Sequence, residues 1–278
     1  TSAGGAVYND GSASTFVADG GATIIGGTIP ADSSSGKSGG VFFNNGGTLT
    51  LNNVVLDGGS PEAPQARQGG VLYVTGATGK NNMTNTTIRN GYASLQGGGM
   101  WISNAATLNL DNVTFEGSKA ANGGNLFIYM GGCVLKNCTF KDGYATGTGG
   151  NVQVYNNGDA AQFENCTFTG GISGNGGNIR TENDVVITGG TIEGGKAQNA
   201  AGEPSGNGGN VSFGASGKTG TLNGVTVKDG IANVGGNINI IPGATVNITG
   251  NSVITGGKAL TYNNGGAHGG NIFCSGTV

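Results

Sequence analysis

Charged residues and histidine are scarce in this sequence, and their scarcity excludes several classes of function. Only 10% of the residues are charged, 12 Lys and Arg stand against 15 Asp and Glu, and His268 is the one histidine. With a net charge of −3 and no basic cluster, nucleic acid is not an expected partner. One histidine leaves little room for histidine-based catalysis or a histidine metal site, so we expect no metal and no cofactor. The sequence has no apolar run long enough for a membrane span.

Proline and aromatic residues are also few, whereas glycine is abundant. The chain has 5 Pro and 61 Gly among 278 residues. Glycine destabilises a helix by roughly 1 kcal/mol per residue relative to alanine, so a helical bundle is excluded. Collagen is excluded because glycine does not recur at every third residue. A hydrophobic content of 35% argues against disorder, so we expect the glycines to serve turns between β-strands.

An internal repeat organises the whole chain. A Gly-Gly-x-apolar unit recurs at intervals of 25 to 35 residues and begins at Gly4, Gly39, Gly69, Gly98, Gly123, Gly149, Gly176, Gly208, Gly235 and Gly269. Short alternating apolar patterns broken by Asn and Gly predict three short strands per unit. We therefore predict an all-β fold: a right-handed, single-stranded parallel β-helix of nine to ten coils, forming one domain over residues 1–278. Stacked coils about 4.8 Å apart make a rod on the order of 43 Å long.

The repeat also predicts how the coil is arranged around its core. Aligned apolar positions should point inward, in a first-strand column of Phe42, Leu72, Trp101, Leu126, Val152, Ile179, Val211, Ile238 and Ile272 and a second-strand column of Leu51, Leu110, Leu135, Phe163, Ile187 and Leu222. The extra residues of the longer units lie just before the next Gly-Gly, as in Ser60 to Gln68 and Gln198 to Asn207, and predict loops on one edge. The chain opens at Thr1 inside repeat sequence without a signal peptide and stops within a unit at Val278, so we expect a segment of a longer protein.

Two columns of asparagine accompany the apolar columns. Stacked side-chain amides can donate and accept hydrogen bonds from coil to coil, and asparagine tolerates left-handed backbone angles, so we expect two structural ladders. One occupies the turn between the second and third strands: Asn53, Asn85, Asn112, Asn137 and Asn165. The other follows Gly-Gly: Asn125, Asn151, Asn178, Asn210, Asn237 and Asn271. Glycosylation is the alternative, because Asn112, Asn137, Asn165 and Asn210 begin N-x-S/T sequons.

These repeats resemble the right-handed parallel β-helix proteins of bacterial surfaces, of the adhesin-like and polymorphic outer membrane protein (autotransporter-passenger) type. Gly4-Gly5-Ala6-Val7 is close to the Gly-Gly-Ala-Ile tetrapeptide of that type, and the likeness covers nearly the whole chain, although later units carry Gly-Gly-Asn. The resemblance implies a secreted or surface-displayed protein that acts as a stalk, adhesin or filament. The same fold also carries pectate-lyase-like enzymes, so the fold alone does not decide activity.

The cysteines fall on columns that are otherwise apolar. Cys133, Cys138, Cys166 and Cys274 are therefore expected to be buried small hydrophobic residues. Cys138 and Cys166 occupy the same position on successive coils, where a disulfide is the alternative.

A catalytic site would need carboxylates that converge, with or without Ca²⁺. Arg180, Glu182 and Asp184 form the nearest cluster, and a Ca²⁺-dependent polysaccharide lyase or hydrolase is the alternative function that it suggests. A further alternative is ice binding by the threonine column Thr87, Thr114, Thr139, Thr167, Thr191 and Thr226. Charged residues stand beside that column, and the flat face that ice requires is not expected.

Aromatic residues are concentrated on the outward positions of the first strand. The alternation places Tyr8, Phe43, Tyr73, Ile102, Phe127, Tyr129 and Tyr155 outside, joined by Val41, Val71 and Met100. A strip of this size should be covered by the Ser60 to Gln68 loop, by a second protomer or by a glycan. We therefore predict a non-enzymatic, extracellular structural or adhesive module whose partners are other coils or copies of itself, or a glycan or host-surface ligand.

Overall fold

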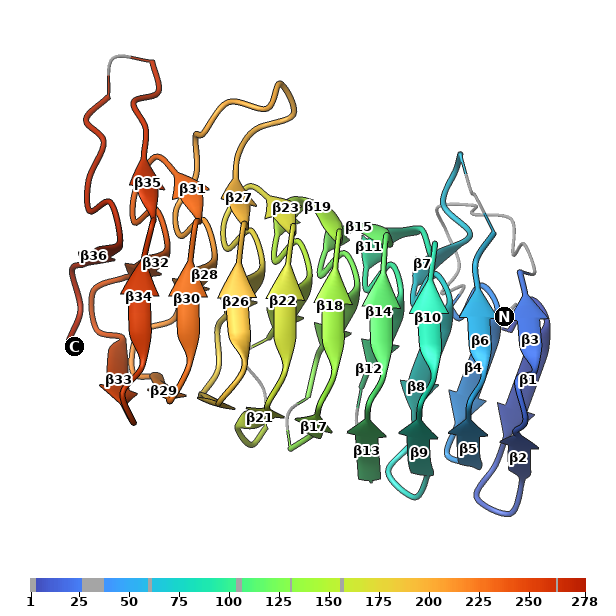
Figure 1. Cartoon of the computed structure of the whole chain (residues 1–278). Helices are drawn as coiled ribbons and strands as arrows, with labels where there is room; N and C mark the ends of the chain where they lie inside the picture. Colours follow the sequence, from blue (N-terminus) through green and yellow to red (C-terminus); the bar gives the residue numbers. More distant parts are fainter. Residues whose placement is uncertain are drawn as a thin grey trace.

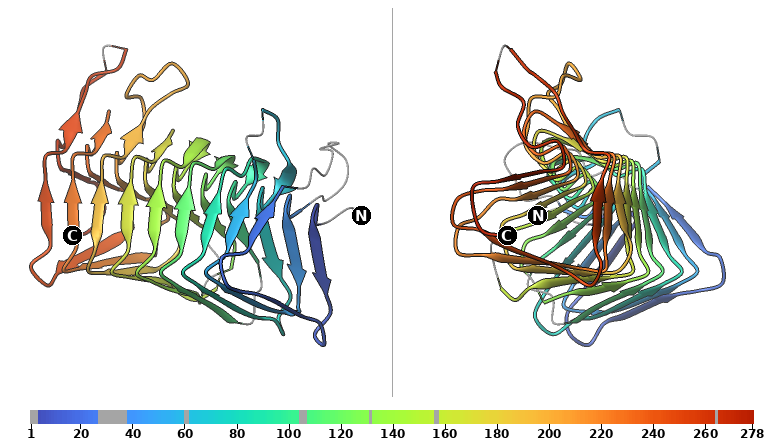
Figure 2. Two further views of the ribbon diagram at one scale, coloured as in Figure 1. Left: turned by 45° about the vertical axis from the view of Figure 1, so that its right-hand side comes forward. Right: turned by 60° about the vertical axis from the view of Figure 1, so that its left-hand side comes forward.

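The computed structural model is a right-handed parallel β-helix whose coils stack side by side along a rod, from the blue N-terminal end to the red C-terminal end (Figures 1 and 2). The structure describes residues 4–26, 38–59, 62–103, 107–130, 132–155, 158–263 and 265–278, and in these ranges it has strands and no helix. Each coil contributes one strand to each of several parallel sheets, because residues one unit apart in the repeat lie side by side.

Sheet 1 is the 10-stranded sheet formed by the first strand of each coil. Its strands are β1 (Val7–Asp10), β4 (Phe42–Asn45), β8 (Leu72–Thr75), β12 (Met100–Ile102), β16 (Leu126–Ile128), β20 (Val152–Val154), β24 (Ile179–Thr181), β28 (Val211–Phe213), β32 (Ile238–Ile240) and β36 (Ile272–Cys274).

Sheet 2 is the 9-stranded sheet formed by the second strands. It consists of β2 (Thr15–Ala18), β5 (Thr48–Asn52), β9 (Lys80–Thr84), β13 (Thr107–Asp111), β17 (Val134–Lys136), β21 (Ala161–Glu164), β25 (Val185–Thr188), β29 (Thr219–Asn223) and β33 (Thr245–Thr249). Every second-strand residue that the sequence placed inside is buried here, from Leu51 to Leu222.

Sheet 3 is the 9-stranded sheet of the third strands. Its members are β3 (Thr23–Ile25), β6 (Val55–Asp57), β10 (Thr87–Arg89), β14 (Thr114–Glu116), β18 (Thr139–Lys141), β22 (Thr167–Thr169), β26 (Thr191–Glu193), β30 (Thr226–Lys228) and β34 (Val253–Thr255). The inward rings of Phe115, Phe140 and Phe168 stack along the core, with centroids 4.9 and 4.8 Å apart.

A fourth strand per coil, which the sequence analysis did not anticipate, forms the 8-stranded sheet 4. It comprises β7 (Ala66–Gln68), β11 (Ala93–Gln96), β15 (Lys119–Asn122), β19 (Tyr144–Thr148), β23 (Ile172–Ser173), β27 (Lys196–Ala197), β31 (Ile231–Ala232) and β35 (Lys258–Ala259). These strands are short, and most of them lie just before the Gly-Gly pair, whereas a loop separates β27 and β35 from it. Their small inward residues, such as Ala93, Ala145 and Ala197, let the chain approach the core closely.

The inward column of sheet 1 corrects the sequence analysis at one coil. Met100 pairs with Leu72 and Leu126 and is fully buried, so Met100 and not Trp101 occupies the core position. The cause is the run of three glycines, residues 97–99. Gly97 has a φ of 63°, close to the 61° of Gly69 and Gly123 in the neighbouring coils, so the unit starts one residue earlier than predicted. Consequently Ile102 points inward and Trp101 outward. Cys274 continues an inward column but is exposed, since it lies in the last coil.

The asparagine column that follows Gly-Gly forms the predicted ladder. Each amide donates to the next Asn Oδ1, at 2.7 Å from Asn125 through to Asn237 and at 2.9 Å from Asn237 to Asn271. Asn178 is typical: its second N–H donates to Glu193 O at 2.9 Å, and its Oδ1 also accepts from Gly171 N at 3.0 Å. Asn125 through Asn237 are buried, and every polar atom of these amides has a partner. Burial of Asn210 excludes glycosylation there in the folded protein.

The other asparagine column is a turn column with exposed side chains. Asn53, Asn85, Asn112, Asn137 and Asn165 all have φ between 51° and 55°, the left-handed conformation that was predicted. The continuous ladder that was also predicted is wrong. Asn112 donates to Asn85 Oδ1 at 2.7 Å, but Asn137 donates to Asp111 instead. A ladder that the sequence analysis missed joins Asn9, Asn44 and Asn81 inside the first coils, at 2.7 and 2.8 Å.

The longer loops project from one edge of the rod, as the position of the extra residues predicted. The segment that follows β6 connects sheet 3 to sheet 4, and the segment that follows β27 connects sheet 4 to sheet 1; both project from the side of the stack that carries the sheet 4 strands (Figure 1). The last three residues of the first predicted loop, Ala66–Gln68, form strand β7. Residues 60–61 of the first of these loops lie outside the described part of the chain.

Candidate functional site

The outward aromatic residues of sheet 1 stack on one another in a continuous row. We call Tyr8, Phe43, Tyr73, Trp101, Tyr129 and Tyr155 the aromatic ladder. Ring centroids lie 5.2, 4.9, 4.3, 5.7 and 5.5 Å apart along it, and successive rings are within 23° of parallel. Trp101 was expected in the core, and its place in this row follows from the shifted start of its unit.

Four residues assigned to the outward strip are buried instead. Ile102 and Met100 point into the core because their unit starts one residue early. Val41 and Val71 are fully buried, and in the repeat they occupy the same position as the ladder residue Asn125. Phe127 does lie on the outward side, in register with Trp101, but only 1% of it is exposed. It contacts Tyr155 at a centroid distance of 6.0 Å.

The stacking leaves little of the ladder open to a ligand. Each inner ring has its faces against its two neighbours, so its edge is the part that reaches the surface. Only the end members are widely exposed, Tyr8 at 52% and Tyr155 at 40%, whereas Trp101 is 5% exposed. Burial raises the pKa of Tyr73 to about 12, against the opposing effect of a hydrogen bond with Ser38. A glycan stacked on the rings, one of the three covers considered for this strip, would need free ring faces, and the inner rings do not offer them.

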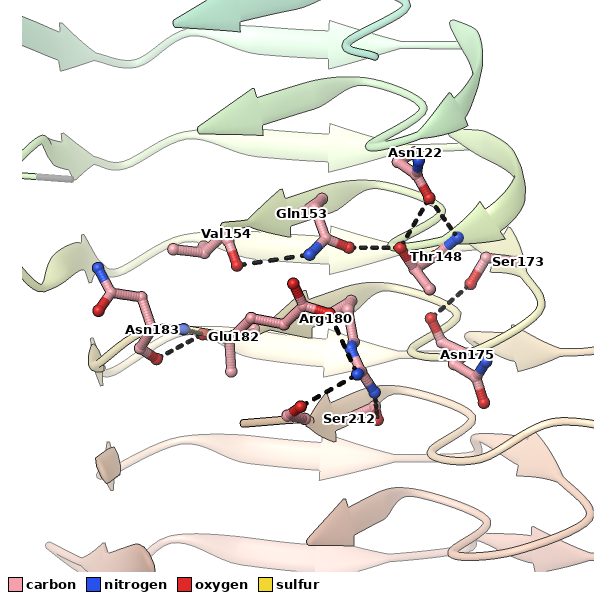
Figure 3. Close-up of polar contacts among 12 residues, drawn as sticks. Asn122, Thr148, Gln153, Val154, Ser173, Asn175, Arg180, Glu182, Asn183 and Ser212 are labelled. Carbon is pink, nitrogen blue, oxygen red and sulfur yellow. Dashed lines mark hydrogen bonds and ion pairs between the residues drawn. The ribbon is translucent and has the colours of Figure 1, made fainter. Parts of the chain in front are cut away.

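Beyond Phe127 the outward face of sheet 1 becomes polar and is covered by the chain itself. Thr148 Oγ1, at the end of β19, lies 2.6 Å from Gln153 Oε1 in β20 and 2.9 Å from Asn122 Oδ1 (Figure 3). Gln153, Ser212 and Asn239 are buried. The end of β19 therefore contacts Gln153, and the Arg180 side chain contacts Ser212, so parts of the chain other than the loop of residues 60–68 help to cover this face.

The candidate catalytic cluster is only partly brought together. Arg180 donates to Glu182 Oε1 at 3.2 Å, to Ser212 Oγ at 2.8 Å and to Gly214 O at 3.2 Å (Figure 3). Asp184 is held elsewhere, where its Oδ1 accepts from Thr219 N at 2.6 Å in the next coil. Among the described residues no three His, Cys, Asp or Glu side chains are placed to share a metal ion.

The cysteines are free thiols in this structure. Cys133, Cys138 and Cys166 are buried, as expected of small hydrophobic residues, whereas Cys274 is exposed. Cys138 and Cys166 are neighbours on successive coils, as predicted, and a hydrogen bond between them together with burial raises the pKa of Cys138. The disulfide alternative is not formed here.

The charged residues of sheet 3 form ion pairs between coils beside the threonine column. Arg89 Nε lies 2.7 Å from Asp57 Oδ2, Lys141 Nζ lies 2.9 Å from Glu116, and Lys228 Nζ lies 2.8 Å from Glu193. Burial favours a higher pKa for Asp57, but hydrogen bonds from Asn90, Gly59 and Arg89 and the charge of Arg89 outweigh it and lower the pKa.

Sequence reasoning missed an outward column on sheet 4, which we call the sheet 4 column. Its members pair in register from coil to coil: Tyr92, Lys119, Tyr144, Ile172, Lys196, Ile231 and Lys258. A groove of about 700 Å³ lies over its first three members, lined also by Glu62, Asn90 and Thr146. The signal in the sequence is a Gly/Ser-x-Ala/Ser triplet once per unit, as in Gly91-Tyr92-Ala93 and Gly195-Lys196-Ala197.

Comparisons of the chain with family models, with curated proteins and with solved structures found no match. The described residues contain no helix that is long and apolar enough to cross a membrane. The architecture that the chain shows is that of a parallel β-helix solenoid with an asparagine ladder.

Proposed function

We propose that this chain is a non-enzymatic, extracellular structural or adhesive module: a rigid rod of a surface stalk, adhesin or filament. The observation that carries the proposal is the asparagine ladder, which bonds six successive coils and whose buried amides, Asn125 through Asn237, have every polar atom paired. The aromatic ladder also joins successive coils, by ring stacking along the outer face of sheet 1 in the earlier coils. A coil that contacts both neighbours at several positions keeps a fixed spacing from them along the rod axis. Such a rigid rod is suited to displaying surface groups far from the point where it is attached.

The extracellular location and the partners follow from the resemblance to surface β-helix proteins. In such a role the rod contacts other coils or copies of itself, and its outward columns meet a glycan or host surface. The self-stacked aromatic ladder supports a structural use of those rings, with Tyr8 and Tyr155 as its open ends.

The positions of the acidic residues also favour a non-enzymatic role. Glu182 is neutralised by Arg180, and Asp184 is engaged by the backbone of the next coil. A lyase or hydrolase of the pectate-lyase-like kind would use such groups on substrate, and their present partners would first have to be displaced.

The rigid-rod proposal can be tested by measuring the distance between the two ends. Spin labels are attached to exposed Cys274 and to the Asp10→Cys variant, which lie in β36 and β1 at opposite edges of the 10-stranded sheet 1. Nine coil steps predict one narrow distance distribution centred at about 43 Å. The buried thiols should stay unlabelled, and a Cys274→Ser control should lose the distance. A broad or multimodal distribution would overturn the proposal.

A further inference from the structure

The sheet 4 column is unusual in its charge. Its lysines Lys119, Lys196 and Lys258 are exposed, and no carboxylate of the described residues lies within 4.0 Å of their amines. Elsewhere several cations pair with carboxylates, on sheet 3 as described and on sheet 2 through Lys136 and Glu164 at 2.9 Å, whereas Lys80 and Lys218 have no ion pair among the described residues. The sheet 4 column differs in that its cations recur in one row. A row of unpaired cations on one edge of a chain whose net charge is −3 attracts an anionic ligand to that edge.

The groove over the start of this column has the chemistry of a sugar site. Tyr92 and Tyr144 are half-buried on either side of Lys119, two coils or about 9.6 Å apart along the rod axis. Neither ring is stacked on another ring of the described residues, in contrast to the inner rings of the aromatic ladder. Asn90, Ser94 and Thr146 add amide and hydroxyl groups to the lining, which also includes Glu62.

We propose that this groove binds a carboxylate-bearing polysaccharide, laid along the rod with one uronate carboxylate on Lys119 Nζ and the flanking sugars against Tyr92 and Tyr144. The proposal rests on the adhesive role proposed above and names its ligand. Aromatic rings accept the C–H faces of sugars, and the amide and hydroxyl groups accept their hydroxyls. Lysines recur only at every second or third coil, so most acidic units of a polymer laid along the rod would meet no cation. The tyrosines, amides and hydroxyls beside Lys119 would then have to recognise the sugar rings themselves.

The test is a titration of the purified protein with polygalacturonate, with dextran as the neutral polymer and single-stranded DNA as the competing polyanion. We expect polygalacturonate to bind, dextran not to bind, and binding to weaken as salt is raised. Lys119→Ala should weaken binding at least 10-fold, and Tyr92→Ala with Tyr144→Ala should weaken it similarly at high salt. Lys136→Ala removes the same charge from sheet 2 and should leave binding within 2-fold.

Three results would overturn the inference. If Lys119→Ala and Lys136→Ala lose the same affinity for polygalacturonate, the binding is a non-specific charge attraction. If the protein binds DNA more strongly than polygalacturonate, the ligand of the groove is another polymer. Absence of polygalacturonate binding, with the end-to-end distance still narrow and near 43 Å, would sink this inference and leave the rigid rod standing.

Discussion

Asparagine occupies two kinds of position in each coil, and the same side chain has a different role in each. In the turn column the left-handed backbone is what matters, since glycine replaces asparagine there at Gly189 and Gly224 with φ of 64° and 65°. In the buried ladder the side-chain amide is essential. Each inner amide accepts a hydrogen bond from a turn N–H, donates one to a backbone carbonyl, and bonds to the asparagine amides of the two neighbouring coils. Burial therefore decides which asparagines are replaceable.

Asn178→Ala should be strongly destabilising because it removes the middle of the buried ladder. The change leaves Gly171 N without its partner and removes one of two hydrogen bonds from Asn151 Nδ2, Asn210 Oδ1 and Glu193 O. A loss of about 3 kcal/mol in the free energy of unfolding is expected, measured by urea denaturation. Asn109→Ala is the matched control: Asn109 is exposed and donates to Asn82 at 2.9 Å, so the change should be about 0.5 kcal/mol or less. Equal effects would contradict a structural ladder.

At the scale of single elements, the inter-coil ion pairs of sheet 3 differ in burial and therefore in pH dependence. Asp57 is largely buried and its pKa is lowered in the folded protein, so its stabilisation is present above the unfolded pKa of about 3.9 and is lost as pH falls through the folded pKa. Arg89 is partly exposed, so solvent screens the ion pair and the hydrogen bonds contribute most.

Asp57→Asn should therefore destabilise the protein by about 1 kcal/mol at pH 7, with the difference from wild type shrinking below about pH 4. Thermal or urea unfolding over a pH series measures it. Glu193→Gln, in the exposed pair with Lys228, should change stability little at any pH. If the difference in the free energy of unfolding between Asp57→Asn and wild type persists at pH 2, the carboxylate charge is not the cause of that difference.

Much of the element structure could be predicted from the sequence, because one pattern is repeated many times. The stacked strands, the inward columns and the edge that carries the loops all follow from it. Trp101 was misplaced because a run of three glycines leaves the start of a unit ambiguous by one residue, and one residue reverses every side chain of a strand. Sheet 4 was missed because strands of two to five residues with alanine inside carry little hydrophobic signal. The groove over Tyr92, Lys119 and Tyr144 was missed with it.

At the scale of the whole molecule, the outer face of sheet 1 and sheet 4 differ in the side chains that they leave open to a ligand. The outer face of sheet 1 is occupied by the chain's own rings and amides, whereas sheet 4, beside the loop edge, keeps unpaired lysines and open tyrosines. Glu62, from the loop that follows β6, lies in that groove, so the loop edge and the sheet 4 column belong to one surface. The proposed function, together with the proposed polysaccharide groove, predicts that the rod holds a polymer without cleaving it.

Retention of a polymer without cleavage tests this claim most directly. Immobilised protein is incubated with polygalacturonate, and both the amount retained and its chain length and unsaturated ends are measured. We predict retention that depends on Lys119, with chain length unchanged over hours and with Ca²⁺ added. Shortened chains or new unsaturated ends, abolished by Glu182→Ala, would show that the rod is an enzyme and would contradict the account.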